Sequence, residues 1–205
     1  MVDTKISSGT KTTKNAIAEA CLEEAYRLIA EKGLERLSLR EVARRVGVSH
    51  QAPYKHFPSR DHLLAAVIAR AYEEFAEALE ARPRSDIPVL DLRAMGEAYL
   101  DFAAHHPLKY HLMFGAVLPD PASHPEMTAN AQATFALLVE GLRRARPGDQ
   151  VEPDAHVIWS ALHGCASLRQ SAALEALGPT EDDMAAAEAR LFQRLADIIL
   201  RPPAV

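Results

Sequence analysis

The sequence predicts an all-α protein. Strand signals are weak, because no segment sustains a period-two alternation of apolar and polar residues and no Asn-Gly or Asp-Gly hairpin turn occurs. Helix signals recur along the chain as apolar residues at spacings of three and four, placed between residues that start or stop helices. Most of the 13 prolines stand where a helix would begin or end. We therefore expect about nine helices, with boundaries uncertain by roughly two to four residues.

The first predicted helix spans residues 14–32 and follows an N-terminal arm, residues 1–13, that we expect to be flexible. Its apolar face is formed by Ile17, Cys21, Ala25, Leu28 and Ile29. The helix stops at Gly33, because glycine adopts at little cost the left-handed conformation that commonly follows a helix end.

Two short helices follow, joined by a turn through Gly47. Ser38 opens the first with a capping box, in which its hydroxyl accepts a helix amide and Glu41 reaches back to the amide of Ser38. Ser49 caps the second, which Phe57-Pro58 closes. Two helices of about two turns, joined through a glycine, match the helix-turn-helix unit.

The remaining elements are longer. A helix begins at Ser59 and fades at Arg82-Pro83. Four later helices carry proline in the first turn, where a missing amide costs nothing; they start at Asp86-Ile87-Pro88, His106-Pro107, His124-Pro125 and Glu152-Pro153. The last two predicted helices, about 154–177 and 180–200, are adjacent and carry wide apolar faces.

Composition limits the class of protein. The 205 residues are 48% hydrophobic and 25% charged, which is typical of a globular chain of one or two domains. No run of 18 apolar residues occurs and the N-terminus lacks the apolar core of a signal peptide, so we expect a cytoplasmic protein without membrane contact. The two cysteines, Cys21 and Cys165, are too few for a disulfide framework and stand in no C-x-x-C pattern.

The net charge of −5 conceals an uneven distribution. Residues 1–60 hold 11 Lys and Arg against 7 Asp and Glu, a charge of +4, whereas residues 61–205 hold 12 against 21, a charge of −9. A bare pair of short helices is equally consistent with a small corner that only packs against a bundle. Because this pair lies in the basic part of an acidic chain, the pattern favours a DNA-binding module.

Residues 14–64 resemble the DNA-binding domain of the TetR family of bacterial transcriptional regulators. The resemblance rests on the first helix ending at Gly33 and on these runs: Leu37-Ser38-Leu39, Val42-Ala43, Gly47-Val48-Ser49, Tyr54-Lys55-His56-Phe57, Ser59-Arg60 and Leu63-Leu64. It implies a three-helix helix-turn-helix domain over residues 14–60, with the helix-turn-helix itself at about 38–57. Residues 61–205 would then form a C-terminal helical bundle that binds ligand and dimerises.

The resemblance also implies how DNA is read. The second short helix, residues 49–56, would enter the major groove, with Tyr54 and Lys55 at positions that usually contact the backbone. The DNA-binding residues predicted are Ser38, Arg44, Arg45, Ser49, His50, Gln51, Ala52, Tyr54, Lys55, His56 and Arg60. Pro53 departs from the family pattern, so this helix begins late or is distorted. Lysines of the N-terminal arm fit phosphate contacts and a solvated tail equally well.

Two segments of the acidic body resemble the regulatory domain of the WHG type, over about residues 90–178. They are Ala98–Ala103 with the residues that follow it to Gly115, and Trp159–Gly164. Trp159 and His163 share a helical face and fit either a pocket wall or a packed core. The predicted pocket residues are Tyr99, Phe102, Tyr110, Met113, Phe114, Trp159 and His163.

A dimer interface is the second implication for the body. The final two helices would pair with those of a second copy, although they fit the closing of the monomer core as well. The predicted interface residues are Ile158, Leu162, Cys165, Ala187, Leu191, Leu195 and Ile198. Abundant alanine in these helices permits the close approach that such an interface needs.

Catalytic and metal-binding patterns are weak. His105, His106 and His111 lie close in sequence, but there is no His-Glu-x-x-His and the cysteines lack ligand spacing. Neither a nucleophile elbow nor a phosphate loop occurs. We predict a non-enzyme without metal or cofactor: a ligand-responsive repressor that binds double-stranded operator DNA as a homodimer and responds to an unknown small molecule. The alternative is an all-α enzyme or metalloprotein in which the short-helix pair is only scaffold.

Overall fold

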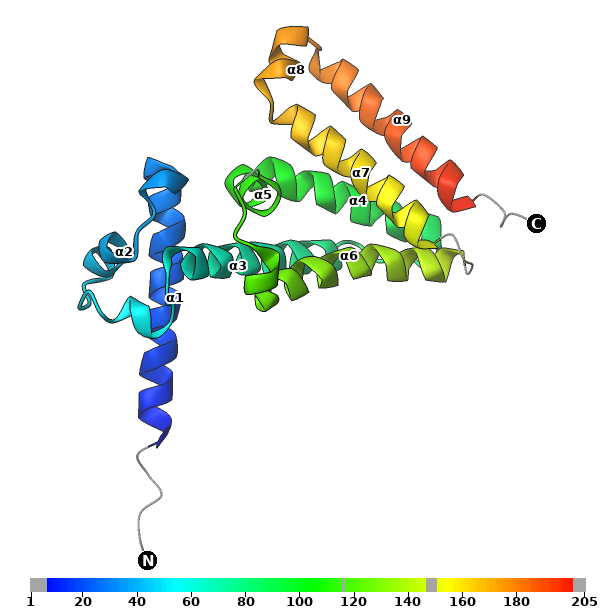
Figure 1. Ribbon diagram of the computed structural model, residues 1–205. Helices are drawn as coiled ribbons and strands as arrows, with labels where there is room; N and C mark the ends of the chain where they lie inside the picture. Colours follow the sequence, from blue (N-terminus) through cyan, green and yellow to red (C-terminus); the bar gives the residue numbers. More distant parts are fainter. Residues whose placement is uncertain (1–6, 116, 147–150, 201–205) are drawn as a thin grey trace, which may run out of the picture. The chain divides into compact units, whose positions relative to one another are not determined.

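The structure, a computed structural model, describes residues 7–115, 117–146 and 151–200 (Figure 1). These residues form nine α-helices and three short 3-10 helices and contain no strand, so the all-α prediction is confirmed. The chain divides into an N-terminal unit, Met1–Arg70 with Ala116–Thr128, and a C-terminal unit, Ala71–Gly115 with Ala129–Val205. The division falls between Arg70 and Ala71, inside a long helix, whereas the sequence analysis placed the domain boundary at residue 60. A continuous helix gives no sequence signal for a boundary at that point.

The N-terminal unit begins with α1 (Ser7–Lys32), which starts seven residues before the expected position, so residues 7–13 of the expected arm are helical; residues 1–6 lie outside the described part. The helix ends at Gly33, whose φ is 82°. After η1 (Leu34–Arg36), α2 (Leu39–Val46) is capped by Ser38, whose Oγ accepts from the amide of Glu41 at 3.2 Å. The predicted helix ends are confirmed where glycine takes the left-handed conformation, since Gly47 has a φ of 78°.

The predicted second short helix is wrong as an α-helix. Residues 50–52 form turns, and only η2 (Pro53–Lys55), a 3-10 helix, follows. Pro53 has no N–H to donate to the carbonyl of Ser49, and the amide of Ala52 instead donates to that carbonyl at 2.9 Å, three residues back. The proline therefore tightens the segment, in which one α-type bond follows, from the amide of Phe57 to the carbonyl of Pro53 at 2.8 Å.

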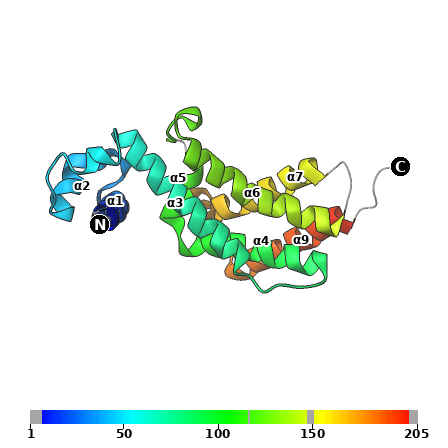
Figure 2. The same ribbon diagram turned by 90° about the horizontal axis from the view of Figure 1, so that it is seen from below.

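The C-terminal unit takes the later part of α3 (Arg60–Glu80) and most of α6 (Pro125–Ala145), which is preceded by η3 (Pro121–Ser123). Its other helices are α4 (Pro88–His105), α5 (Pro107–Phe114), α7 (Val151–Arg169), α8 (Ala172–Leu177) and α9 (Glu181–Leu200). Helices α4, α7 and α9 contact one another, and α7 and α9 run antiparallel with α8 at their turn (Figures 1 and 2).

The predicted helix 154–177 is in fact two helices. Ser171 interrupts it: its hydroxyl donates to the carbonyl of Leu168 at 2.8 Å and accepts from the amide of Leu174 at 3.4 Å. Serine competes in this way with the helical ladder and caps a new helix. The start of α9 is as expected, because Thr180 and Asp183 form a reciprocal capping box at 2.9 and 3.1 Å.

A buried ion pair fixes the connection between α3 and α4. Nη2 of Arg82 lies 2.8 Å from Oδ2 of Asp91, and the two side chains are 1% and 9% exposed. Arg82 also donates to the carbonyl oxygens of Leu79 and Asp91. Burial opposes the charge of Asp91, but the hydrogen bond and charge of Arg82 prevail and lower the pKa of this carboxyl. The pair remains ionised and holds the end of α3 against the first turn of α4.

Asp91→Asn should lower the free energy of unfolding by about 3 kcal/mol or more, because it leaves the charge of Arg82 buried without its partner. Glu97→Gln on the same helix is the matched control; it breaks the exposed pair of Arg93 and Glu97 and should cost at most about 0.5–1 kcal/mol. Urea unfolding followed by circular dichroism measures both. Equal losses in the two variants would contradict this role of the buried pair.

Candidate functional site

The N-terminal unit exposes a cluster of polar and aromatic side chains, which we name the reading segment (residues 49–55). His50, Gln51, Tyr54 and Lys55 are exposed, with Tyr54 at 47%, while Pro53 is buried. None of these four side chains forms a hydrogen bond or ion pair within the described part of the chain. They are therefore available to a partner, and all can donate hydrogen bonds to phosphates or base edges.

The other predicted members of this surface differ in exposure. Ala52 and His56 are half-buried, and the ring of His56 lies 6.2 Å from that of Phe57. Ser49 is exposed. The hydroxyl of Ser38 is occupied as the cap of α2, so this residue positions the helix.

The three predicted arginines have different surroundings. Arg44 is 65% exposed and donates to Glu41 on its own helix at 2.7 and 2.9 Å. Arg45 is only 16% exposed, and its guanidinium lies between three carboxylates: 2.7 Å from Glu31, 3.4 Å from Glu41 and 3.9 Å from Glu24. It fixes α2 against α1, which the sequence could not indicate because Glu31 lies 14 residues away.

Glu41 is the centre of this charge network. Its carboxylate accepts from Arg44 and Arg45 rather than reaching back to the amide of Ser38, so that half of the predicted capping box is wrong. The hydrogen bond from Arg44, followed by that from Arg45, lowers the pKa of Glu41 to about 2. The carboxylate is thus charged at any physiological pH.

Arg60 also has a positioning role. Its Nη2 and Nε donate to the carbonyl oxygens of Leu34 and Leu37 at 2.8 and 3.2 Å. The first residue of α3 therefore holds the connection between α1 and α2. A residue that the sequence analysis missed is Arg40, which is exposed on α2 and has no carboxylate partner among the described residues. Its place in the first turn of α2, beside the cap, was the available signal.

In the C-terminal unit the predicted pocket residues form an aromatic cluster. Phe75 of α3 is fully buried at its centre, with ring centroids of Tyr99, Phe102 and Trp159 at 5.0, 4.9 and 6.2 Å. Phe114 lies at 6.4 Å from Phe75. The expectation that all seven residues line a pocket is not met, because most of them fill space against one another.

A hydrogen-bonded chain runs through this cluster. The hydroxyls of Tyr99 and Tyr110 are 3.1 Å apart, and that of Tyr110 lies 2.7 Å from Nδ1 of His163. On the other side of the ring, Nε2 of His163 lies 3.3 Å from Oγ of Ser167. Burial lowers the pKa of His163 and raises those of Tyr99 and Tyr110, so the chain is uncharged at neutral pH.

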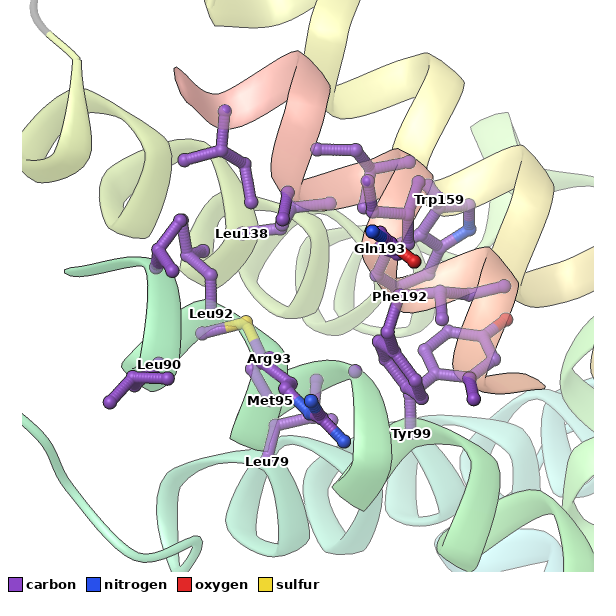
Figure 3. Close-up of a pocket in the computed structure, with 18 residues that line it drawn as sticks. Leu79, Leu90, Leu92, Arg93, Met95, Tyr99, Leu138, Trp159, Phe192 and Gln193 are labelled. Carbon is purple, nitrogen blue, oxygen red and sulfur yellow. The ribbon is translucent and has the colours of Figure 1, made fainter. Parts of the chain in front are cut away.

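A cavity of about 340 Å³ lies beside this cluster, between α4, α7 and α9 (Figure 3). Tyr99 and Trp159 line it, as predicted. Phe102, Tyr110, Met113, Phe114 and His163 do not. The sequence analysis missed the lining residues of α4 other than Tyr99 and the contribution of α9, which supplies Phe192 and Gln193. The signal was the apolar breadth of α9, which was assigned to a dimer interface instead.

Three predicted interface residues are internal. Ile158, Leu162 and Leu195 are buried and line the cavity of their own chain, so their assignment to a dimer surface is corrected. Ala187 is exposed, and Cys165, Leu191 and Ile198 are half-buried.

The described residues offer neither a metal site nor a membrane span. In the described ranges, no three His, Cys, Asp or Glu side chains group as metal ligands would. His105, His106 and His111 are exposed. No helix in the described part of the chain combines the length and apolar character that crossing a bilayer requires.

Two family models match this chain. Residues 22–67 match the family model described as "Bacterial regulatory proteins, tetR family", and residues 92–199 match the model "Tetracyclin repressor-like, C-terminal domain". This chain belongs to the TetR family. The N-terminal match contains α2, the reading segment and the start of α3. The C-terminal match overlaps the stretch that resembles WHG-type domains and contains most of the residues that line the cavity.

Individual TetR-family relatives and similar proteins are distant. The HTH-type transcriptional regulator Rv1816 of Mycobacterium tuberculosis is 28% identical over 123 residues, which are 58% of this chain and 52% of that protein. The chain thus spans about half the length of that relative. The HTH-type transcriptional regulator Rv0681 of the same species is 26% identical over 77% of this chain and 72% of that protein. A solved protein of unknown function from Rhodococcus sp. RHA1 is 28% identical with a TM-score of 0.71, over 88% and 95% of the two chains.

The depressed pKa of His163 predicts a pH-dependent stability. The unfolded chain takes up a proton near the ordinary pKa of 6.5, whereas the folded chain resists it, so the stability provided by neutral His163 is full above that pH and is lost as pH falls through it. His163→Gln should cost about 1 kcal/mol at about pH 7.5 through lost hydrogen bonds. The difference in free energy of unfolding between the wild type and His163→Gln should narrow at about pH 5.5. Urea unfolding at both pH values measures this difference. A difference that widens on acidification would contradict the lowered pKa of His163.

Proposed function

We propose that this TetR-family chain is a sequence-specific DNA-binding transcriptional regulator that acts by binding rather than by catalysis. The observation that carries the proposal is the reading segment, whose exposed donors have no partner within the described chain. They project from a unit whose first 60 residues carry a charge of +4. Arg45 and Arg60 hold the elements on either side of this segment in place, so its geometry is preset before DNA arrives.

The affinity of one such module for DNA is mainly electrostatic. Arg40, Arg44 and Lys55 neutralise phosphates and release counterions, which makes binding strongly dependent on salt. His50, Gln51 and Tyr54 supply the few contacts that discriminate sequences, each worth about 1–3 kcal/mol where it reaches a base edge. Since one module provides little of either, a homodimer on a palindromic operator supplies the remainder.

The dimer surface is proposed on the outer sides of α7 and α9. Val157, Gly164 and Leu168 form an apolar stripe on α7, with Val157 and Leu168 53% and 52% exposed. On α9 a corresponding flank carries Ala187, Leu191 and Ile198. A Cβ built on Gly164 meets no atom within 4 Å, so the glycine is not required by packing within its own chain. Its presence is explained by the close approach of a helix from a second copy.

The cavity between α4, α7 and α9 is the proposed effector site. It is enclosed mostly by apolar side chains and has one wall on α9, beside the proposed dimer surface. A ligand that prefers one arrangement of α9 shifts the population of dimers competent to bind the operator. The protein is thus a ligand-responsive repressor of the cytoplasm.

Phosphate contact and positioning are separable by mutation. Lys55→Gln should weaken binding to a DNA fragment from upstream of the gene. It should also reduce the slope of log K against log salt concentration by about one, and leave the thermal stability unchanged. Arg45→Gln should instead lower the melting temperature, because three carboxylates lose their common partner. Arg194→Gln, on the exposed surface of α9, is the control and should change neither. Fluorescence anisotropy at several salt concentrations measures binding. A Lys55→Gln protein with wild-type affinity and slope would refute the DNA-binding role.

Gly164 tests the dimer. Gly164→Leu should preserve helicity but shift the protein from dimer to monomer, because the new side chain occupies the space that the partner helix uses. Ala136→Leu on the exposed side of α6 is the control and should leave the dimer intact. Sedimentation velocity across a concentration series gives the mass. If Gly164 were merely solvated, replacement would stabilise the helix by about 0.5–1 kcal/mol and leave the association state unchanged.

A further inference from the structure

The cavity has two chemically different walls. Leu79, Leu90, Leu92, Met95 and Leu138 lie on one side, and Tyr99, Trp159 and Phe192 lie on the other (Figure 3). Gly96 brings the aromatic wall close to α4, since a Cβ at this position would lie 2.6 Å from Cε1 of Phe192. A molecule between these walls contacts hydrocarbon on one face and rings on the other.

The polar groups of the cavity are few. Among its described lining residues, the ionisable side chains are Arg93 and Tyr99. The hydroxyl of Tyr99 is already 3.1 Å from that of Tyr110, so this residue presents its ring to the cavity. Gln193 is exposed, so its amide lies at the mouth of the cavity, on the side of Trp159 and Phe192 (Figure 3). An amide can both donate and accept, which suits a hydroxyl, carbonyl or amide on a ligand.

The charge of Arg93 is already balanced. Its Nε donates to Glu97 at 2.8 Å, and its guanidinium lies 5.6 Å from the ring centroid of Phe192. Arg93 is also exposed, so it lies at the rim. An anionic ligand would have to compete with Glu97 for this arginine. A cationic ligand would find no carboxylate in the lining at all, and burying an unpaired charge is costly.

Size restricts the ligand further. The volume of about 340 Å³ corresponds to about eleven water molecules at about 30 Å³ each, the share of one molecule in liquid water. This is the lower part of the range of ligand pockets. The site therefore suits a small molecule.

We propose that the effector is an uncharged, mainly apolar molecule of this size with a single hydrogen-bonding group that the Gln193 amide receives. To call this molecule an effector rests on the regulatory function proposed above. Binding of the molecule in the cavity does not depend on DNA. Apolar burial drives the binding, and the amide fixes the orientation.

Trp159 allows a direct test, because it is the one tryptophan of the sequence and stands on the cavity wall. The full-length protein is titrated with 1-decanol, decanoate and decylamine, which share a chain and differ in head-group charge, and tryptophan emission is recorded. We expect saturable quenching by 1-decanol with a Kd at least about tenfold lower than that of decanoate, and weakest binding by decylamine. Equal or tighter binding of decanoate or decylamine would overturn the assignment of a neutral ligand.

Variants locate the response. Ala196→Phe fills the cavity from α9 and should abolish the quenching by 1-decanol, whereas Ala136→Phe on α6 should leave it unchanged. Gln193→Leu should raise the Kd for 1-decanol by about threefold to tenfold, because one hydrogen bond is lost. Circular dichroism checks that each variant is folded. Full quenching in a folded Ala196→Phe protein would place the ligand elsewhere and overturn the proposal.

The same preparation is tested for DNA binding without any ligand. Absence of 1-decanol binding in a protein that still binds upstream DNA would reject the ligand class and leave the regulator intact. Saturable 1-decanol binding in a protein that binds no DNA would support the cavity assignment and reject the regulator.

Discussion

The continuity of α3 is the constraint on which the rest of the structure depends. Its first residue, Arg60, binds the carbonyl oxygens of Leu34 and Leu37 in the N-terminal unit. Fifteen residues later, Phe75 occupies the centre of the aromatic cluster of the C-terminal unit with no exposed surface. The same helix thus carries anchors in both units, and the buried Arg82–Asp91 pair fixes the connection that leads from its far end into α4.

Local chemistry accounts for the parts of this fold that could be predicted from the sequence. Gly33 and Gly47 end helices through their left-handed conformations, and Thr180 with Asp183 starts one through a reciprocal cap. Each of these signals acts over three or four residues. Pro53 is also a local signal, but an incomplete one. Its missing amide indicated a distorted helix, but not that a 3-10 helix would replace the α-helix. The roles of Arg45 and Arg60 could not be predicted, because their partners lie 14 to 26 residues away in the sequence.

The candidate pocket shows a different limit of sequence reasoning. Aromatic residues near Trp159 were expected to line a cavity, yet most of them fill the core with Phe75. Apolar periodicity identifies the faces that are buried but not which of them are completely filled, because both kinds of face are formed by the same residue types. The cavity lies where α9 covers α4 and α7, and the sequence of α9 contains no feature that distinguishes Phe192 from an ordinary core residue. Buried polar groups provide a better signal: the neutral chain from Tyr99 to His163 is satisfied internally. The polar groups left to a ligand are those at the rim of the cavity, Gln193 and the already paired Arg93.

The position of α9 explains how a small neutral molecule can affect a charged interaction with DNA. One flank of α9, at Phe192, Gln193 and Ala196, lines the cavity, while Leu191 and Ile198 lie on the flank proposed to meet the partner chain. A ligand between the walls would therefore act on the helix that we propose as part of the dimer surface, without altering the charge of either unit. Only a difference in ligand affinity between the two dimer geometries can shift their populations, and couplings of this kind are typically about 1–3 kcal/mol. Because operator binding by the proposed dimer requires two modules at once, that amount would suffice to separate a bound repressor from a released one.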